Sequence, residues 1–440
     1  MKLLPRPSST CQILLSLMLL EGGFAAIGQS IGFVEPDLQL ANLAAGQTLP
    51  VTFQLTNGTA VPIQIQAIHA ACECTSLQQA PAEIPAHGQG EFVWLFDSAS
   101  SRGPVFQTVT VEVVNGPVIQ GQFSTSVTAS SAASTTARIR PRGVYIHDPS
   151  TIVQCGGEHW FFSTGMGIPS HHSTTLTNWL SGPRVFPNLP GWTTNAVPGN
   201  EGVIWAPDII HQGDRYCLYY AVSTWGKPTS AIGLATNPTL DPAAPNYHWT
   251  DDGPVVCTTD KDDFNAIDPC AFLDDDGRLW LAFGSYWSGI KLIELNPATG
   301  RRLAPDSPLY ALAQHHEGND TSLEAACLTR HGQYYYLFVN WYACCRGTNS
   351  TYEIRVGRSA NVTGPYRDRS GRDMRANGGD IFLHSQGRYI GPGHAGIYRE
   401  NGTNWFSFHF YDGERYGLAS IGVRPLIWTN GWPALVTSPP

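Results

Sequence analysis

Residues 271–283 read AFLDDDGRLWLAF: an apolar strand, a turn that contains Gly277, and a second, aromatic strand. The turn glycines of five such units are 57, 64, 55 and 70 residues apart. A four-stranded propeller blade takes roughly 40 to 50 residues plus loops. The repeat therefore predicts a five-bladed β-propeller. Its five copies are Ser150–Val153 with Gly156 and Trp160–Phe162, Ile209–His211 with Gly213 and Tyr216–Tyr220, Ala271–Leu273 with Gly277 and Leu279–Phe283, Cys327–Thr329 with Gly332 and Tyr334–Phe338, and Ile397–Arg399 with Gly402 and Trp405–Phe410.

The first strand of each repeat begins eight residues before its turn glycine, or nine in the third repeat. The residues at these positions are Asp148, Trp205, Asp268, Glu324 and His394. Because the innermost strands of a propeller start side by side around its central channel, we expect the five side chains to converge on one pocket. Buried polar groups cost free energy unless they are paired. The set therefore predicts a functional site, with a calcium site or buried ion pairs as the structural alternatives.

Paired carboxyl groups in such a pocket are the minimal apparatus for hydrolysis of a glycosidic bond. One protonated acid gives its proton to the leaving oxygen, and one carboxylate activates water or attacks. A third carboxyl group tunes the other two, because like charges raise one another's pKa. Trp205, Trp225, Tyr286 and Trp287 offer flat faces for sugar rings, although packing between blades would also account for them.

The composition agrees with an all-β chain. Charged residues make up 14% of the 440 residues, whereas the chain contains 45 Gly, 32 Pro and 48 aromatic residues (13 Trp, 17 Tyr and 18 Phe). This many turn-forming residues favours short strands over helices or disorder. The net charge of −9 provides no basic surface, so we expect no nucleic-acid partner.

The sequence divides into four segments. Residues 1–26 have the basic, apolar and small-residue order of a signal peptide, and their apolar run is too short for a membrane span. We therefore expect a secreted or periplasmic protein. Short alternating strands over residues 30–126 predict a small β-sandwich domain. Residues 127–138 lack aromatic and charged side chains apart from Arg138 and predict a linker, and residues 139–440 form the predicted propeller.

Several stretches within residues 139–440 resemble family 43 glycoside hydrolases, specifically endo-1,5-α-L-arabinanases. The segments are His147–Ser150, Trp205–Asp208, Asp263–Pro269, Phe283–Ile290 and Cys344–Gly347. The resemblance implies a five-bladed propeller and hydrolysis of arabinan with inversion. It also implies Asp148 as general base, Glu324 as general acid and Asp268 as pKa modulator. His394 matches the position that holds a water-coordinated calcium or similar ion. The predicted substrate contacts are Trp205, Asp208, Trp225, Asn265, Ser285, Tyr286 and Trp287.

Alternative functions follow from the same residues. An exo-acting α-L-arabinofuranosidase or a β-xylosidase would use the same chemistry, and a carbohydrate-binding propeller would lack catalysis. Residues 30–126 resemble, through Ala71–Thr75, immunoglobulin-like domains of unknown function from exported bacterial proteins. This domain could bind carbohydrate, anchor the protein or act as a spacer, and its protein partner is unknown. Because it lacks a clustered aromatic platform, we expect a spacer or a protein contact.

Overall fold

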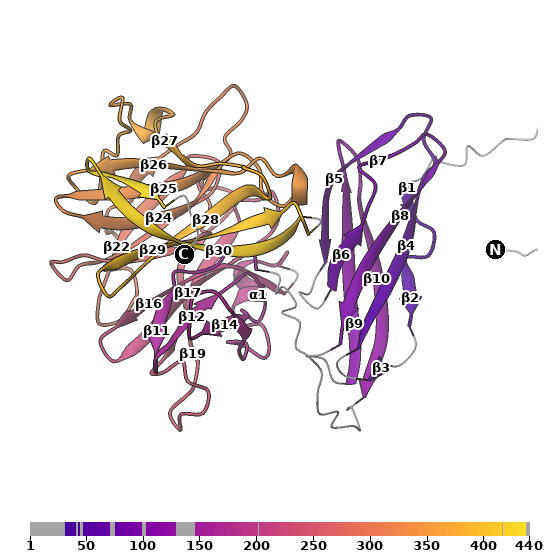
Figure 1. Cartoon of the computed structure of the whole chain (residues 1–440), viewed down its shortest axis with the longest axis horizontal. Helices are drawn as coiled ribbons and strands as arrows, with labels where there is room; N and C mark the ends of the chain where they lie inside the picture. The colour runs from indigo at the N-terminus through magenta and orange to yellow at the C-terminus, as the bar shows by residue number, and fades with distance from the viewer. Residues whose placement is uncertain are drawn as a thin grey trace, which may run out of the picture.

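The structure is a computed structural model that describes residues 31–40, 43–44, 47–70, 75–98, 103–128, 146–200, 202–415 and 417–436. The predicted signal peptide and most of the predicted linker lie outside these residues. Figure 1 shows a narrow N-terminal part, in indigo and purple, beside a broader C-terminal part. Nearly all regular structure is β-strand. The helical turns are α1 (Thr193–Ala196), η1 (Gly347–Asn349) and η2 (Met374–Ala376).

The N-terminal part contains a four-stranded and a six-stranded sheet. The first has the order β1 (Ile31–Phe33), β4 (Thr48–Asn57), β8 (Gln89–Asp97) and β6 (Thr75–Gln79). The second has the order β2 (Asp37–Gln39), β10 (Val118–Thr128), β9 (Gly103–Val113), β5 (Ile63–Ala70) and β7 (Glu83–Ile84), and β3 (Leu43–Ala44) also pairs with β10.

Alternating side chains join these two sheets in one core. In β8, Phe92, Trp94 and Phe96 are buried while the residues between them are less so, as expected when successive side chains point to opposite faces. They pack against Val109 and Val111 of β9 in the other sheet. The opposite face of each sheet is thereby left for solvent or for other contacts.

The C-terminal part contains five antiparallel sheets, the arrangement of a β-propeller. Their strand orders are β11 (Val153–Cys155), β12 (Glu158–Phe162), β14 (Ser170–Ser173), β15 (Leu180–Ser181); β13 (Gly165–Met166), β16 (Val203–Gln212), β17 (Arg215–Ser223), β18 (Ser230–Asn237), β19 (Thr250–Thr258); β20 (Cys270–Leu273), β21 (Leu279–Phe283), β22 (Ile290–Leu295), β23 (Tyr310–Ala313); β24 (Leu323–His331), β25 (Tyr334–Trp341), β26 (Glu353–Ser359), β27 (Asp380–Leu383); and β28 (Tyr389–Glu400), β29 (Thr403–Asp412), β30 (Leu418–Thr429), β31 (Trp432–Leu435).

Each repeat found in the sequence is a hairpin in one of these sheets: β11–β12, β16–β17, β20–β21, β24–β25 and β28–β29. The five turn glycines all have φ between +59° and +83°, a backbone conformation that other residues adopt only with strain. The glycines were therefore a reliable marker of the hairpins.

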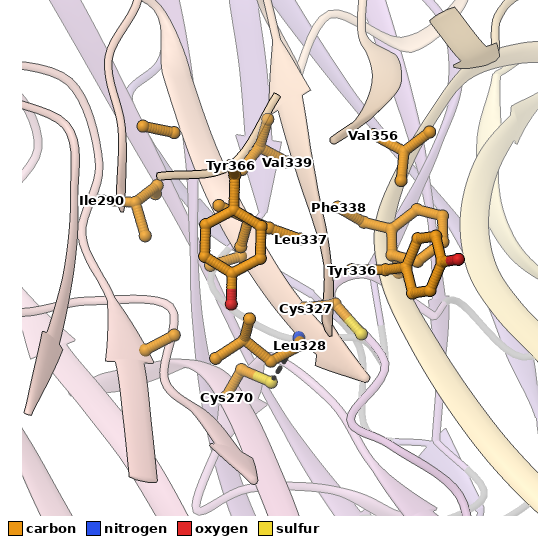
Figure 2. Close-up of a cluster of buried hydrophobic side chains, with 14 of the residues drawn as sticks. Cys270, Ile290, Cys327, Leu328, Tyr336, Leu337, Phe338, Val339, Val356 and Tyr366 are labelled. Atoms are coloured by element: carbon orange, nitrogen blue, oxygen red, sulfur yellow. Dashed lines mark hydrogen bonds between the residues drawn. The ribbon is translucent and has the colours of Figure 1, made fainter. Parts of the chain in front are cut away.

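Neighbouring sheets of the propeller pack through continuous apolar surfaces. Figure 2 shows this packing around Cys270, Leu337 and Tyr366, and it marks the 3.3 Å hydrogen bond from the Leu328 N–H to Cys270 Sγ. Strand β25 is buried along almost its whole length. Both faces of such a strand are covered, which explains why these strands read as apolar runs and not as alternating ones.

The ring closes between the first and the last sheet. The Ile146 N–H donates a 3.0 Å hydrogen bond to the Ala419 carbonyl oxygen. Ile152 and Phe161 of the first sheet pack against Tyr398 and Trp405 of the last. No helix in the described part of the chain has the length and hydropathy that a bilayer crossing requires.

Candidate active site

Each of the five sheets has one non-glycine residue in the left-handed region near the start of its inner strand. These residues are Asp148, Ala206, Asp268, Ala325 and His394, with φ between +35° and +55°. Such conformations cost about 1–3 kcal/mol each and persist where the surrounding structure fixes them, often at functional sites. The backbone repeat thus identifies the same end of every inner strand as the site.

This backbone repeat differs by one residue from the spacing read in the sequence. Trp205 and Glu324 each precede the left-handed residue of their sheet, whereas Asp148, Asp268 and His394 are that residue. The register also shifts near the inner ends of three of these strands: between Trp205 and Asp208, between Glu324 and Cys327, and on both sides of Gly393 in β28. An added residue in a bulge is invisible to counting from the turn glycine.

Asp148 is surrounded by hydrogen-bond donors and imidazole rings. Its Oδ2 lies 2.8 Å from His147 Nδ1 and accepts a 2.6 Å hydrogen bond from Thr164 Oγ1. Its Oδ1 lies 3.5 Å from His394 Nδ1 and 3.6 Å from His409 Nδ1. Burial would raise the pKa of Asp148, but the charge and hydrogen bond of His147, with His394 and His409, hold that pKa well below its usual range.

The tautomer of His409 and the orientation of the His147 ring follow from their partners. The Asp148 N–H donates to His409 Nδ1 at 3.1 Å, so this nitrogen carries no proton, and burial lowers the pKa of His409. Tyr411 Oη accepts from the Cys345 N–H at 2.7 Å and lies 2.6 Å from His147 Nε2. The two ring nitrogens of His147 thus face Tyr411 on one side and Asp148 on the other.

Glu324 has the opposite electrostatic character. Its Oε2 accepts a 2.7 Å hydrogen bond from Ser285 Oγ, and Tyr352 Oη donates to its Oε1. Burial, together with the charge of Asp148, raises the pKa of Glu324 to about 7, and the Ser285 hydrogen bond opposes this rise. A large share of Glu324 is therefore protonated near neutral pH, while Asp148 is ionised.

Asp268 is the third carboxyl group of the pocket. Its side chain is buried, and its Oδ2 accepts a 3.0 Å hydrogen bond from the Ala325 N–H. Burial, together with the charges of Glu324 and Asp148, raises the pKa of Asp268 well above its usual range. The structure therefore brings Asp148, Asp268 and Glu324 into one electrostatic unit.

The predicted substrate contacts occupy different depths. Trp205 and Trp225 make an edge-to-face contact with ring centroids 5.9 Å apart, and Trp225 is 56% exposed. Tyr286 and Trp287 make a similar contact at 6.4 Å. Ser285 is buried, and its hydroxyl group donates a hydrogen bond to Glu324. Trp225 is thus exposed, Trp205, Tyr286 and Trp287 are half-buried, and Ser285 is in direct contact with a carboxyl group.

Two further predicted contacts are buried structural groups. Asp208 accepts hydrogen bonds from the Thr151 N–H at 2.9 Å and from the Ala271 N–H at 2.8 Å, which join three neighbouring sheets. Asn265 accepts a hydrogen bond from Ser230 Oγ. Both oxygens of Asp208 are thus occupied by backbone donors, a role that the sequence did not reveal.

Sequence reasoning did not single out four polar residues of the site: His147, Thr164, Tyr352 and His409. A signal for His409 was present, because Ser407, His409 and Tyr411 alternate with phenylalanines along β29 and place a polar face on a buried strand. Cys344 and Cys345, which form a disulfide, lie close to this group, with Cys345 Sγ 3.8 Å from His147 Nε2.

The arrangement can carry out acid–base hydrolysis. An ionised carboxylate, Asp148, interacts electrostatically with Glu324, whose pKa is raised, and half-buried and exposed aromatic rings belong to the same set of predicted site residues. This is the pair of protonation states by which glycoside hydrolases cleave their substrates.

Comparison with known proteins agrees with this chemistry. The model of glycosyl hydrolases family 43 matches residues 143–433, and the chain belongs to this family. A second model, a protein family of unknown function, matches residues 31–123. The two matches fall on the C-terminal and N-terminal parts described above.

Individual relatives have related activities in their names. An extracellular exo-α-(1→5)-L-arabinofuranosidase of Cellvibrio japonicus is 39% identical over 300 residues, covering 66% of this chain and 86% of the relative. An extracellular endo-α-(1→5)-L-arabinanase of Bacillus subtilis is 40% identical over 294 residues, covering 66% and 87%. The solved structure of a Bacillus licheniformis endo-arabinanase matches with a TM-score of 0.61 at 41% identity, covering 66% of this chain and 97% of that one.

Proposed function

We propose that the protein is a secreted or periplasmic endo-1,5-α-L-arabinanase that cleaves internal bonds of arabinan with inversion. The observation that carries the mechanism is the contrast in the surroundings of two carboxyl groups. Asp148 faces the His147 ring and the Thr164 hydroxyl, whereas Glu324 is buried against Ser285 and Tyr352, and their pKa values shift downward and upward, respectively. The named activities of the relatives support arabinan as the substrate, and two of those names include "extracellular".

In the proposed mechanism, Asp148 is the general base. The His147 ring and the Thr164 hydroxyl keep the carboxylate ionised and oriented. Asp148 removes a proton from water as the water attacks the anomeric carbon. Glu324 gives its proton to the departing sugar oxygen. The bond between the anomeric carbon and the water oxygen thus forms as the glycosidic bond breaks. Asp268 holds the segment after Glu324 through Ala325.

For the architecture, we propose that the five C-terminal sheets are the blades of a five-bladed propeller over residues 139–440. The two N-terminal sheets form a β-sandwich domain over residues 30–126, and residues 127–138 connect the two. The contacts between successive inner strands, from β11 through β28, support the blade count.

The product mixture tests this function. Linear arabinan should give a ladder of oligosaccharides at early times, whereas arabinose alone would indicate exo action. Xylan should be a poor substrate. NMR of the first product should show inverted configuration at the anomeric carbon. Retention, or release of arabinose only, would contradict the proposal.

The expected calcium ion finds few protein ligands near His394. Calcium prefers six to eight oxygen ligands, whereas the closest acidic oxygen to His394 Nδ1 is Asp148 Oδ1 at 3.5 Å. In the described part of the chain, the group that could share an ion is His147 with Asp148 and His409, because Cys344 and Cys345, which also lie near His147, are joined in a disulfide. A calcium ion at His394 would thus depend mainly on water, and it stays a prediction.

A further inference from the structure

The N-terminal part contacts the propeller through the outer face of its six-stranded sheet. The ring of His69 on β5 lies 5.8 Å from the ring of Trp225, at an interplanar angle of 52°. On the neighbouring strand β9, Glu112 Oε1 lies 3.2 Å from His69 Nε2. Figure 1 shows β5 and β9 on the side of the N-terminal part that faces the propeller.

The charge of a second propeller residue, Arg346, acts on Glu112. The hydrogen bond from His69 lowers the pKa of Glu112, burial opposes this, and the charge of Arg346 lowers the pKa further. Arg346 also lowers the pKa of Tyr286, which burial and nearby acids raise. The exposed guanidinium of Arg346 is therefore within electrostatic range of both Glu112 and the predicted substrate contact Tyr286.

Trp225 and Arg346 are both connected, through neighbouring residues, to Asp148, the proposed general base. Trp225 packs on Trp205, and the next residue, Ala206, donates its N–H to Thr164 Oγ1, which donates to Asp148. On the other side, Arg346 follows Cys345, whose N–H donates to Tyr411 Oη beside His147. The N-terminal part thus meets the propeller at residues that are linked to Asp148 through short series of contacts.

The chemistry at this junction fits a sugar. Trp225 remains 56% exposed although two aromatic rings contact it, so part of its apolar face is free. The side chain of His69 is 34% exposed and that of Glu112 is 15% exposed. An open indole face beside a hydrogen-bonding imidazole–carboxylate pair can stack on a furanose ring and bind its hydroxyl groups.

We propose that His69 and Glu112 of the N-terminal domain form, with Trp225, a distal sugar subsite of the arabinan groove. The inference rests on the proposed function, because it assigns the subsite to the same substrate. The sequence of residues 30–126 lacks a clustered aromatic platform, which made a spacer or a protein contact the expectation. The aromatic face is supplied by the propeller, and the N-terminal domain supplies the polar groups.

Binding by full-length protein that carries Asp148→Asn tests this subsite without turnover. Calorimetry should compare linear α-1,5-arabino-oligosaccharides of two and six sugars. His69→Ala should weaken hexasaccharide binding by about fivefold, as expected for one lost contact, and should leave disaccharide binding unchanged. Glu112→Gln should weaken the hexasaccharide less, because its amide oxygen can still accept a hydrogen bond.

Two controls separate binding from folding. Gln66→Ala alters an exposed side chain on the same strand as His69 and should change neither affinity. In the chain with Asp148 intact, His69→Ala should keep the melting temperature and the kcat/KM for an aryl α-L-arabinofuranoside, which is too short to reach a distal subsite.

The outcomes distinguish the inference from the function on which it rests. Arabinan hydrolysis combined with hexasaccharide binding that is independent of His69 would overturn the inference and retain the function. Binding that depends on His69 without arabinan hydrolysis would contradict the function and support the subsite. Equal losses for both oligosaccharides, or a matching loss of melting temperature, would overturn the subsite and make His69 a structural contact.

Discussion

The Ala325 N–H donates a 3.0 Å hydrogen bond to Asp268 Oδ2. Because Ala325 directly follows Glu324, Asp268 holds the segment of chain that presents the proposed acid. The charges of Glu324 and Asp148 also contribute to the raised pKa of Asp268. Asp268 is therefore linked to the Glu324 segment through the backbone, and its own pKa responds to the charge of Glu324.

Replacing Glu324 by Gln should lower kcat on linear arabinan by about a hundredfold to ten-thousandfold, because the leaving alkoxide would lack a proton donor. An aryl substrate with an acidic leaving group needs less protonation and should lose far less. Steady-state kinetics on both substrates measures the difference. Glu317→Gln, at an exposed carboxylate seven residues earlier, is the matched control.

Asp148→Asn provides the contrast for this experiment. Water must be activated whatever the leaving group, so this variant should lose activity on both substrates. Equal losses on both substrates for Glu324→Gln would contradict its assignment as the acid.

The alkaline side of the pH–activity profile should follow Glu324. The acid must be protonated, so activity should fall as pH rises through the pKa of about 7. The Ser285 hydrogen bond stabilises the ionised form and lowers this pKa. Ser285→Ala should therefore move the alkaline limb to higher pH, as kcat/KM measured across the pH range would reveal. A limb that stays in place, or that moves equally in Ser181→Ala on exposed β15, would rule out this role for Ser285.

Asp208→Ala should destabilise the propeller. It would leave the buried N–H groups of Thr151 and Ala271 without an acceptor, at about 1–3 kcal/mol for each unpaired group. Asp208→Asn keeps one acceptor oxygen and should be milder. Thermal unfolding of both variants tests whether Asp208→Ala lowers the melting temperature more than Asp208→Asn does. An unchanged melting temperature with a raised KM would instead favour the substrate contact expected from the sequence.

Prolonged chelation should reduce activity or melting temperature if a hydrated calcium ion lies beside His394, and added calcium should restore both. The ion would offset the negative charge of the carboxyl pocket. His394→Ala should reduce the response to calcium. If chelation changes neither property and His394→Ala leaves arabinan hydrolysis intact, the ion has no part in the reaction.

The hairpins of the propeller could be predicted because their cause is local. A left-handed turn needs glycine, and apolar strands flank it, so Gly156 and its four counterparts identify every inner strand. Three carboxyl groups were also found, because each lies near the start of such a strand. The register shifts next to Trp205 and Glu324 have no comparable local signal.

Contacts between distant segments could not be predicted in this way. His409 lies 261 residues from Asp148 in the chain, so its part in the site depends on ring closure. His69 and Trp225 belong to different domains, and neither has a sequence environment that indicates the other. Likewise, Asp208 was predicted as a substrate contact, and its hydrogen bonds to two other sheets could not be read from the sequence.

The seam between the first and last sheets has a consequence for how the protein matures. Asp148 belongs to the first sheet, yet His394 and His409, which help to set its charge, belong to the last. A chain in which the β28–β29 hairpin has not yet folded therefore keeps His147 beside Asp148 but lacks the two other imidazole rings that surround it. Under the proposed mechanism, activity should therefore appear only after the last sheet has docked against the first, so that activity would report a complete ring.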